Sequence, residues 1–359
     1  MDESSNRRNR YPTMHELQHL SSVVQTNCNI SDAKHARDYT ICTYLLKMRE
    51  YYRWEKGFSF GTRLSKDALG HWLDERERLW TDLEAEPFHC LPLSDQCYDP
   101  FDAEAVNLRL VPEGLVYSSG YGRFAKPHFF LGRLAKTLQC RDSTVFISSD
   151  EYARDLAAPP AMRQGKAIFI RRESFRRMLW EKYEEWCWKK QDNAMARAVA
   201  HYDFERDVDQ ALDRMTENEI EAAILHELGE GMAGDLLDPA WSEMLADLVR
   251  TRAELFVRAV RDHLADCLCT LPELLRAEIQ PSIHFYFANL TGLRRELFPS
   301  LNAAYHAWIA GDSLDSIKLL AAQGKDHWMS VARRTLDLHI NLDARAALEI
   351  EALISESTL

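Results

Sequence analysis

The spacing of apolar residues divides the chain into helical and strand-forming parts. Between 14 and 84, apolar residues recur every three or four positions, as at Ile41, Leu45 and Met48, which places them on one face of a helix. The stretch 87–172 instead contains short apolar runs bounded by glycine, proline or aspartate, which is typical of strands. After 172 the helical spacing returns. We therefore predict helices at 15–25, 31–56 and 65–84, strands at 107–111, 114–118, 128–131, 144–148 and 166–170, and only helices from 173 onward.

These elements predict a mainly helical α+β protein, in which a small antiparallel sheet lies between an N-terminal helical part and a C-terminal helical bundle. A chain of 359 residues is long enough for about two domains. Residues 1–13 are polar, and we expect a disordered tail there. The first domain then covers the N-terminal helices and the sheet, 14–172, and the second is the bundle, 173–359.

One predicted helix, 216–234, combines a histidine, several carboxylates and small residues in an order that suggests chemistry. Thr216 and Glu219 form a capping-box pattern, which predicts that the helix begins at Thr216. Its apolar stripe is formed by Ile220, Ile224, Leu228 and Met232.

Two His-x-x-x-Glu pairs are candidate metal ligands. His226 and Glu230 lie one turn apart on the side opposite the apolar stripe, and the small Gly229 beside them permits close approach by another helix or a ligand. His201 and Glu205 repeat the spacing on an apolar, inward stripe, where polar atoms need a partner or a metal. Two helices that each supply an imidazole and a carboxylate can hold a dinuclear iron, manganese or zinc site. We therefore predict a metal-dependent enzyme of helical-bundle type, oxidative rather than hydrolytic, with further ligands from Glu219, Glu55, His263 or His284.

Both pairs also have a simpler interpretation, namely a hydrogen bond between histidine and glutamate within one helix. The Glu-x-x-His spacing of ferritin-like metal sites is absent from the chain. This alternative stays open at the level of sequence.

The segment His226-Glu-Leu-Gly-Glu230 resembles the His-Glu-x-x-His helix of zinc metallopeptidases. The resemblance implies that His226 is a zinc ligand and that Glu227 is the general base. The chain departs from that pattern at Glu230, where the peptidases have a second histidine.

Glu221 is a second candidate catalytic carboxylate, because it falls close to the apolar stripe of the same helix. If its side chain is buried without a partner, its pKa should be raised, which suits a general acid. The other interpretation is an ion pair with an arginine from a neighbouring helix.

The charge is distributed unevenly. The whole chain carries a net charge of −12, which disfavours a general nucleic-acid binder, yet residues 121–190 contain 15 Lys and Arg against 8 Asp and Glu. Within this segment Arg123, Lys126 and His128 are candidate anion ligands, and exposed charges in a hairpin connection are the simpler account. The whole segment suggests an alternative function, a non-catalytic binding protein with an acidic partner. It could equally pack against acidic residues of the same molecule.

Three segments resemble an uncharacterised family of bacterial hypothetical proteins: Tyr44-Leu-Leu-Lys-Met-Arg-Glu50, Gly122-Arg-Phe-Ala-Lys-Pro-His-Phe-Phe-Leu-Gly132 and Ile224-Leu-His-Glu-Leu-Gly-Glu230. The resemblance implies a bacterial, cytosolic setting and no particular activity. The cysteines agree with this setting, because all eight are scattered and none forms a Cys-x-x-Cys motif, so we expect reduced thiols. No apolar run is long enough for a membrane helix, and we expect a cytoplasmic protein with a small-molecule substrate or an acidic partner.

Overall fold

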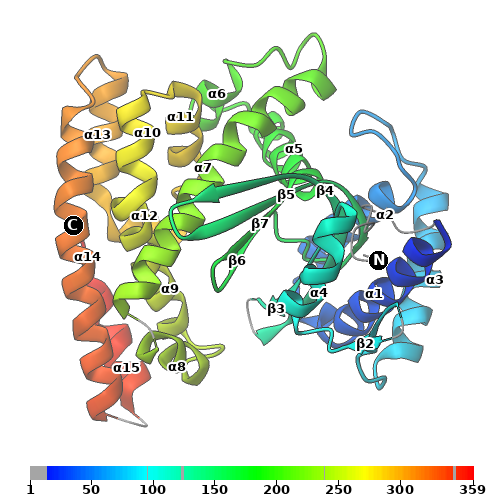
Figure 1. Ribbon diagram of the computed structural model, residues 1–359. Helices are drawn as coiled ribbons and strands as arrows, with labels where there is room; N and C mark the ends of the chain where they lie inside the picture. The colour runs from blue at the N-terminus through cyan, green and yellow to red at the C-terminus, as the bar shows by residue number, and fades with distance from the viewer. Residues whose placement is uncertain (1–13, 95, 123–124, 238, 343–344) are drawn as a thin grey trace, which may run out of the picture. The chain divides into compact units, whose positions relative to one another are not determined.

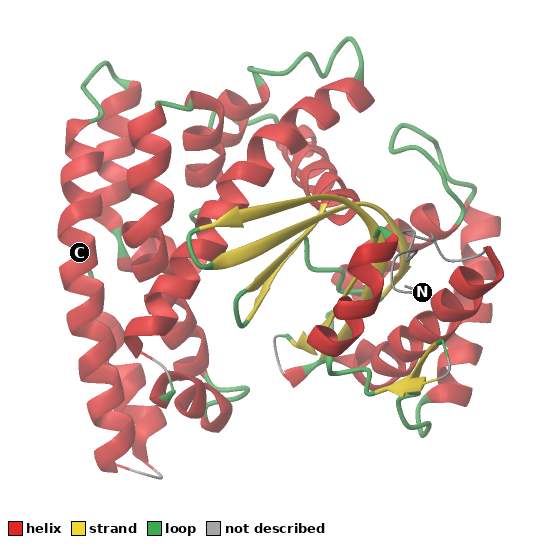
Figure 2. Ribbon diagram, in the orientation of Figure 1, coloured by secondary structure: helices red, strands yellow, loops and turns green. Residues whose placement is uncertain are grey.

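The computed structural model describes residues 14–94, 96–122, 125–237, 239–342 and 345–359. The chain forms two compact units, Met1–Trp180 and Glu181–Leu359, and the division falls within helix α5 (Arg172–Lys189). The fold is α+β and mainly helical, and the described strands all belong to the first unit (Figure 1, Figure 2). The predicted tail, 1–13, lies outside the described residues.

The N-terminal unit begins with α1 (Met14–His35), the short 3-10 helix η1 (Ala36–Asp38), α2 (Ile41–Glu55) and α3 (Lys66–Leu83). The three predicted helices are present, but the second begins at 41 rather than 31. Thr40 is the reason, because its side chain accepts a hydrogen bond from the N–H of Thr43 and so caps α2. Ser65 caps α3 in the same way, which confirms the predicted start of that helix.

A five-stranded sheet follows, in the order β3-β4-β5-β7-β6, together with a separate two-stranded hairpin of β1 and β2. The strands are β1 (Leu91–Leu93), β2 (Gln96–Tyr98), β3 (Leu115–Tyr121), β4 (Pro127–Cys140), β5 (Ser143–Arg154), β6 (Ala161–Gln164) and β7 (Ala167–Arg171). Strands β5 and β7 run parallel, whereas the other pairs are antiparallel. The prediction of an antiparallel sheet is therefore wrong for one pair, because β7 turns back from β6 and inserts beside β5.

The predicted strand at 107–111 is also wrong, because most of this segment belongs to α4 (Ala103–Leu110), which is followed by the short 3-10 helix η2 (Val111–Glu113). Asp102 caps α4 by accepting a hydrogen bond from the N–H of Ala105. Val106 and Leu110, one turn apart, are both buried. A short apolar run in the sequence is typical of both a buried strand and a buried helix. Here the helix cap at Asp102 distinguishes the two.

Cys90 and Cys97 form a disulfide across the β1–β2 hairpin, with their Cα atoms 5.6 Å apart. The prediction of eight reduced thiols is therefore wrong for this pair. The hairpin brings the two cysteines together. Their spacing of seven residues is not a Cys-x-x-Cys motif, so the sequence did not indicate the pair. The other six cysteines, all within the described residues, form no disulfide.

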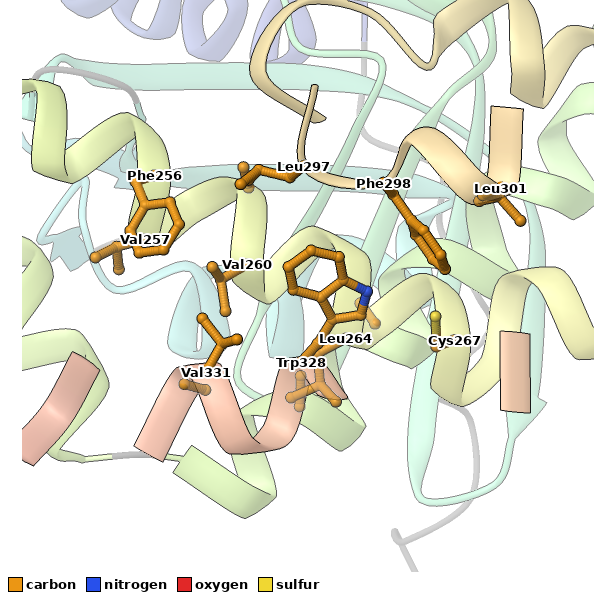
Figure 3. Close-up of a cluster of buried hydrophobic side chains, with 14 of the residues drawn as sticks. Phe256, Val257, Val260, Leu264, Cys267, Leu297, Phe298, Leu301, Trp328 and Val331 are labelled. Atoms are coloured by element: carbon orange, nitrogen blue, oxygen red, sulfur yellow. The ribbon is translucent and has the colours of Figure 1, made fainter. Parts of the chain in front are cut away.

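The C-terminal unit continues from α5 with α6 (Ala194–Val199), α7 (Val208–Leu237), α8 (Ala240–Asp247), α9 (Arg252–Ala265), α10 (Leu271–Ala277), α11 (Gln280–Asn289), α12 (Gly292–Leu297), α13 (Pro299–Ile309), α14 (Asp315–Leu342), α15 (Ala346–Ala352) and the 3-10 turn η6 (Leu353–Glu356). Its core gathers around Trp328 of α14, which packs among Phe298, Leu264 and Val260 (Figure 3). Full burial of each such apolar side chain stabilises the fold by about 1.5–3 kcal/mol.

Helix α7 begins earlier than predicted. Asp207 caps it by accepting a hydrogen bond from the N–H of Gln210, and Thr216 lies inside the helix, where its hydroxyl donates to the carbonyl of Leu212 at 2.6 Å. The capping box at Thr216 is therefore wrong, because the pattern falls inside a longer helix.

Between α9 and α10 the backbone forms a π-helix, η4 (Asp266–Thr270). Short π-helical turns are rare and occur frequently at functional sites. Across the described part of the chain, no helix combines the length and apolar character that spanning a membrane requires.

Candidate metal centre

Three side chains of the C-terminal unit converge as metal ligands would. His226 and Glu230 lie one turn apart on α7, with Nε2 of His226 3.6 Å from an oxygen of Glu230. Asp262 on α9 completes a group whose ligand atoms all lie within 4.8 Å of one another. The three side chains are 27–30% exposed, so solvent reaches the group.

Close contact between α7 and the end of α9 makes this convergence feasible. A Cβ atom built on Gly229 would lie 2.4 Å from the carbonyl oxygen of Ala265, closer than side-chain atoms approach a backbone. Glycine therefore permits the approach of the two helices, as the sequence suggested for the small residues beside His226.

We expect the substitution Gly229→Ala to lower stability by about 1–3 kcal/mol, because the added methyl group must push the two backbones apart. Alanine's better helix propensity, worth up to about 1 kcal/mol, offsets only part of this cost. Urea unfolding measures the change. Gly70→Ala is the matched control, since Gly70 lies in helix α3 with no atom within 4 Å of the added Cβ, and that variant should be as stable as the wild type or more so. Equal stabilities of the two variants would contradict the close contact.

Asp266 sets the orientation of the His226 ring. Its side chain is 1% exposed, and its Oδ1 atom lies 2.9 Å from Nδ1 of His226. Its Oδ2 atom accepts hydrogen bonds from the Tyr286 hydroxyl at 2.9 Å and from the Arg294 guanidinium. Because Asp266 uses Nδ1, the nitrogen left for a metal is Nε2, on the side of Glu230. Metal-binding histidines commonly show this arrangement, with the second ring nitrogen held by a carboxylate.

The pKa shifts describe the charge of the cluster. Burial lowers the pKa of His226, but the hydrogen bonds with Asp266 and Glu230 outweigh it and hold that pKa well above its ordinary value. Burial raises the pKa of Glu230, and the contact with His226 then lowers it to about 2. Burial also raises the pKa of Asp262, which the charge of Arg294 offsets in part. A proton on His226 thus balances the carboxylates, and a metal ion would have to displace it.

The second predicted pair lies elsewhere. Because α6 ends at Val199, His201 and Glu205 belong to the turn that follows it, and both are exposed. The His201 ring stacks on His284, with 5.8 Å between ring centroids, and both members of the pair line a surface cavity with Tyr183, Trp186 and Arg214. The predicted inward, helical position is therefore wrong. The structure does not bring this pair to His226 and Glu230.

The other suggested ligands have protein partners of their own. Ser282 donates to Glu219, Trp72 donates to Glu55 in the N-terminal unit, His263 contacts the carbonyl of Arg294, and His284 contacts the hydroxyl of Tyr305. None of the four belongs to the group formed by the described residues His226, Glu230 and Asp262.

The two candidate catalytic carboxylates on α7 differ in environment. Glu227 is buried, whereas Glu221 is exposed. The role of Glu221 as a general acid depended on its being buried, and this condition is not met. A role for Glu227 as a base stays a prediction, and this residue lies outside the three-ligand group.

Lys126 and His128, two of the predicted anion ligands, lie inside the N-terminal unit. Lys126 is 7% exposed and forms an ion pair with the fully buried Asp32. His128 is 4% exposed, and burial lowers its pKa, which favours the neutral ring. The third, Arg123, lies outside the described residues. Lys126 thus has an internal anionic partner.

Other cations of the basic segment 121–190 are also paired inside this unit. Glu151 is buried and accepts hydrogen bonds from Arg171 at 3.1 and 2.9 Å and from Arg154 at 3.5 Å. Burial raises the pKa of Glu151, but the charges of Arg171 and Arg154 lower it to about 2. These contacts agree with the interpretation in which the basic segment packs within the molecule.

Four residues of the cluster were not predicted from the sequence: Asp262, Asp266, Arg294 and Tyr286. Asp262 and Asp266 offered a signal, since two carboxylates four residues apart in an apolar helix share a face and need partners. Arg294 and Tyr286 offered none, because they reach the cluster only through the packing of α11 and α12.

Comparison with known proteins agrees with the two-part organisation. Residues 19–171 match the N-terminal domain of a family of unknown function (DUF6866), and residues 176–357 match the C-terminal domain of the same family. No curated protein and no solved structure matches the chain. The chain is therefore a member of the family of unknown function DUF6866, and it contains both of the family's domains.

Proposed function

We propose that His226, Glu230 and Asp262 bind one divalent metal ion and that the protein is a metal-dependent enzyme. The observation that carries the proposal is the convergence of the three ligand atoms within 4.8 Å. The fixed orientation of the His226 ring supports it, because Asp266 occupies Nδ1 and leaves Nε2 beside Glu230.

The ligand set favours manganese or iron over zinc. Carboxylates suit manganese and imidazole suits iron, and this group has two carboxylates and one imidazole. Three protein ligands leave positions for water and substrate, as in catalytic metal sites. Such an ion supplies Lewis acidity and, for iron and manganese, a change of oxidation state. We therefore keep oxidation as the first reaction class and hydrolysis as the second.

The proposed site holds one metal ion rather than two, because His201 and Glu205 are exposed in a separate turn. We propose a cytosolic enzyme, because six of its cysteines form no disulfide, although the Cys90–Cys97 disulfide favours an oxidising compartment. The alternative, a binding protein that uses the 121–190 segment, has weaker support, since Lys126, Arg154 and Arg171 are committed to buried carboxylates.

Metal binding tests the proposal directly. We expect the purified protein to bind about one Mn²⁺ or Fe²⁺ per chain, and His226→Ala to weaken binding by more than about 100-fold, since loss of a residue that only orients a ligand already costs about 10–100-fold. Titration calorimetry and elemental analysis measure the affinity and the content. His201→Ala is the matched control and should bind as the wild type does. A wild-type protein that binds neither metal, or equal losses in the two variants, would refute the proposal.

A further inference from the structure

Two arginines lie beside the candidate metal centre. Arg294 on α12 contacts Asp266 and lies 3.8 Å from Asp262, whereas Arg261 on α9 lies 3.9 Å from Glu230, beyond hydrogen-bond distance. The Nε atom of Arg261 is buried and has no hydrogen-bond partner among the described residues. Burying a guanidinium N–H without an acceptor costs free energy. The Nε–H of Arg261 can therefore still donate a hydrogen bond to an oxygen atom.

The charge balance indicates the sign of the missing partner. The carboxylates of Glu230, Asp262 and Asp266 face the guanidinium groups of Arg261 and Arg294. With a neutral His226 as ligand, these groups sum to one negative charge, and a divalent ion changes the sum to one positive charge. A partly buried site with an uncompensated positive charge favours an anion.

We propose that the substrate of this centre is an anion whose phosphate or carboxylate group bridges the metal ion and Arg261. The inference rests on the proposed metal site and adds the class of substrate. Guanidinium is suited to this task because its planar array of donors matches the oxygens of both groups. Metal binding by Glu230 would also take from Arg261 its long ion pair with Glu230, and an oxyanion would take that place.

The side chains are placed so that a small anion can arrive from solvent. Arg261 is 22% exposed and Glu230 is 27% exposed, whereas Asp266 behind them is 1% exposed. Asp266 contacts Nδ1 of the imidazole on the enclosed side, and Tyr286 donates to the other oxygen of Asp266. The anion would therefore approach from the side of Arg261 and Glu230.

The test uses Mn²⁺ as the metal and inorganic phosphate or ¹³C-labelled acetate as the anion, with the full-length protein. Mn²⁺ is paramagnetic, so an anion held at the metal shows a broadened ³¹P or ¹³C resonance. Mn²⁺ stoichiometry is measured first in each sample. We expect Mn²⁺-loaded wild-type protein to broaden at least one of the two resonances beyond the effect of the same concentration of free Mn²⁺. Arg261→Gln should lower the affinity for that anion by at least about tenfold while Mn²⁺ still binds.

Arg295→Gln is the matched control, because Arg295 is the exposed neighbour of Arg294 on α12. It should leave the broadening unchanged. Broadening by phosphate alone would assign a phosphorylated substrate, and broadening by acetate alone a carboxylate. If Mn²⁺ binds but neither resonance broadens, or if Arg261→Gln and Arg295→Gln behave alike, the inference fails and the metal site stands. If Mn²⁺ does not bind, the proposed function fails and the inference fails with it.

Discussion

Replacing Asp266 with alanine is expected to destabilise the C-terminal unit by about 3–5 kcal/mol, the usual cost of leaving a buried charge without its partner. The Asp266 carboxylate accepts hydrogen bonds from Tyr286 and Arg294 and contacts His226. Burial raises its pKa, but the charge of Arg294 and the hydrogen bond with His226 hold that pKa well below its ordinary range. Alanine would leave all three partners facing a position without an acceptor. Urea unfolding gives the free energy, and hydrogen exchange on α7, α9 and α11 locates the effect.

Asp262→Ala is the control that separates stability from metal binding. The ion pair between Asp262 and Arg294 is 3.8 Å long and partly exposed, so its loss should cost less than about 1 kcal/mol. Both variants should bind the metal more weakly, Asp262→Ala because a ligand is removed and Asp266→Ala because His226 is no longer oriented. Equal stability of the two variants would show that Asp266 does not hold the cluster together.

The second large expected effect is a pH dependence of the protein's stability that comes from Glu219. This residue is 2% exposed on α7, and burial raises its pKa to about 8, although the hydrogen bond from Ser282 works against the shift. In the unfolded chain a glutamate has a pKa of about 4.3. Between these two values the folded protein binds more protons than the unfolded chain, so stability falls as the pH rises. At about 1.4 kcal/mol per pKa unit, the loss is about 3–5 kcal/mol once the pH exceeds 8.

The substitution Glu219→Gln removes this titration and keeps an oxygen that can accept from Ser282. We expect the variant to match the wild type near pH 4.5 and to be about 3–5 kcal/mol more stable at pH 9. Guanidinium unfolding at several pH values measures the difference in unfolding free energy between the variant and the wild type. The titrations of the other groups cancel from this difference. Glu221→Gln, at an exposed position of the same helix, should not show this gain in stability at pH 9. A difference between Glu219→Gln and the wild type that does not change with pH would contradict the assignment.

Local signals in the sequence predicted much of the helical content. They failed where contacts beyond the local segment determine where a helix begins. Ser65 marked the start of α3, because a cap acts within three residues. Thr216 has an equally good cap pattern but lies inside α7, because Asp207 caps the helix earlier. Residues before and after Thr216 on this helix are buried, as at Leu212, Ile220 and Ile224. Tertiary burial thus overrides a local pattern that is correct in isolation.

The candidate site divides in the same way. The pairing of His226 with Glu230 follows from helical spacing alone, and the structure places them 3.6 Å apart. His201 and Glu205 have the same spacing, but the inward placement predicted for them assumed that one helix continued through 199–205. His263 was suggested as a ligand, whereas its neighbour Asp262 is the one that reaches the cluster, since the ring of His263 stacks on Trp328 in the core. Which of two adjacent residues faces a neighbouring helix depends on packing that no local pattern contains.

The π-helix η4 restricts how the length of the chain can vary. The hydrogen bonds of a π-helix span one residue more than those of an α-helix, and this extra residue rotates all later side chains by about 100° relative to uninterrupted winding. This rotation lets one continuous backbone enclose Asp266 and still bury Leu271, Leu274 and Leu275 of α10. A homologue that lost a single residue from η4 would regain regular winding, but it would have to turn either the carboxylate or the leucines toward water. Insertions and deletions should therefore be tolerated in the loops of this unit long before they are tolerated here.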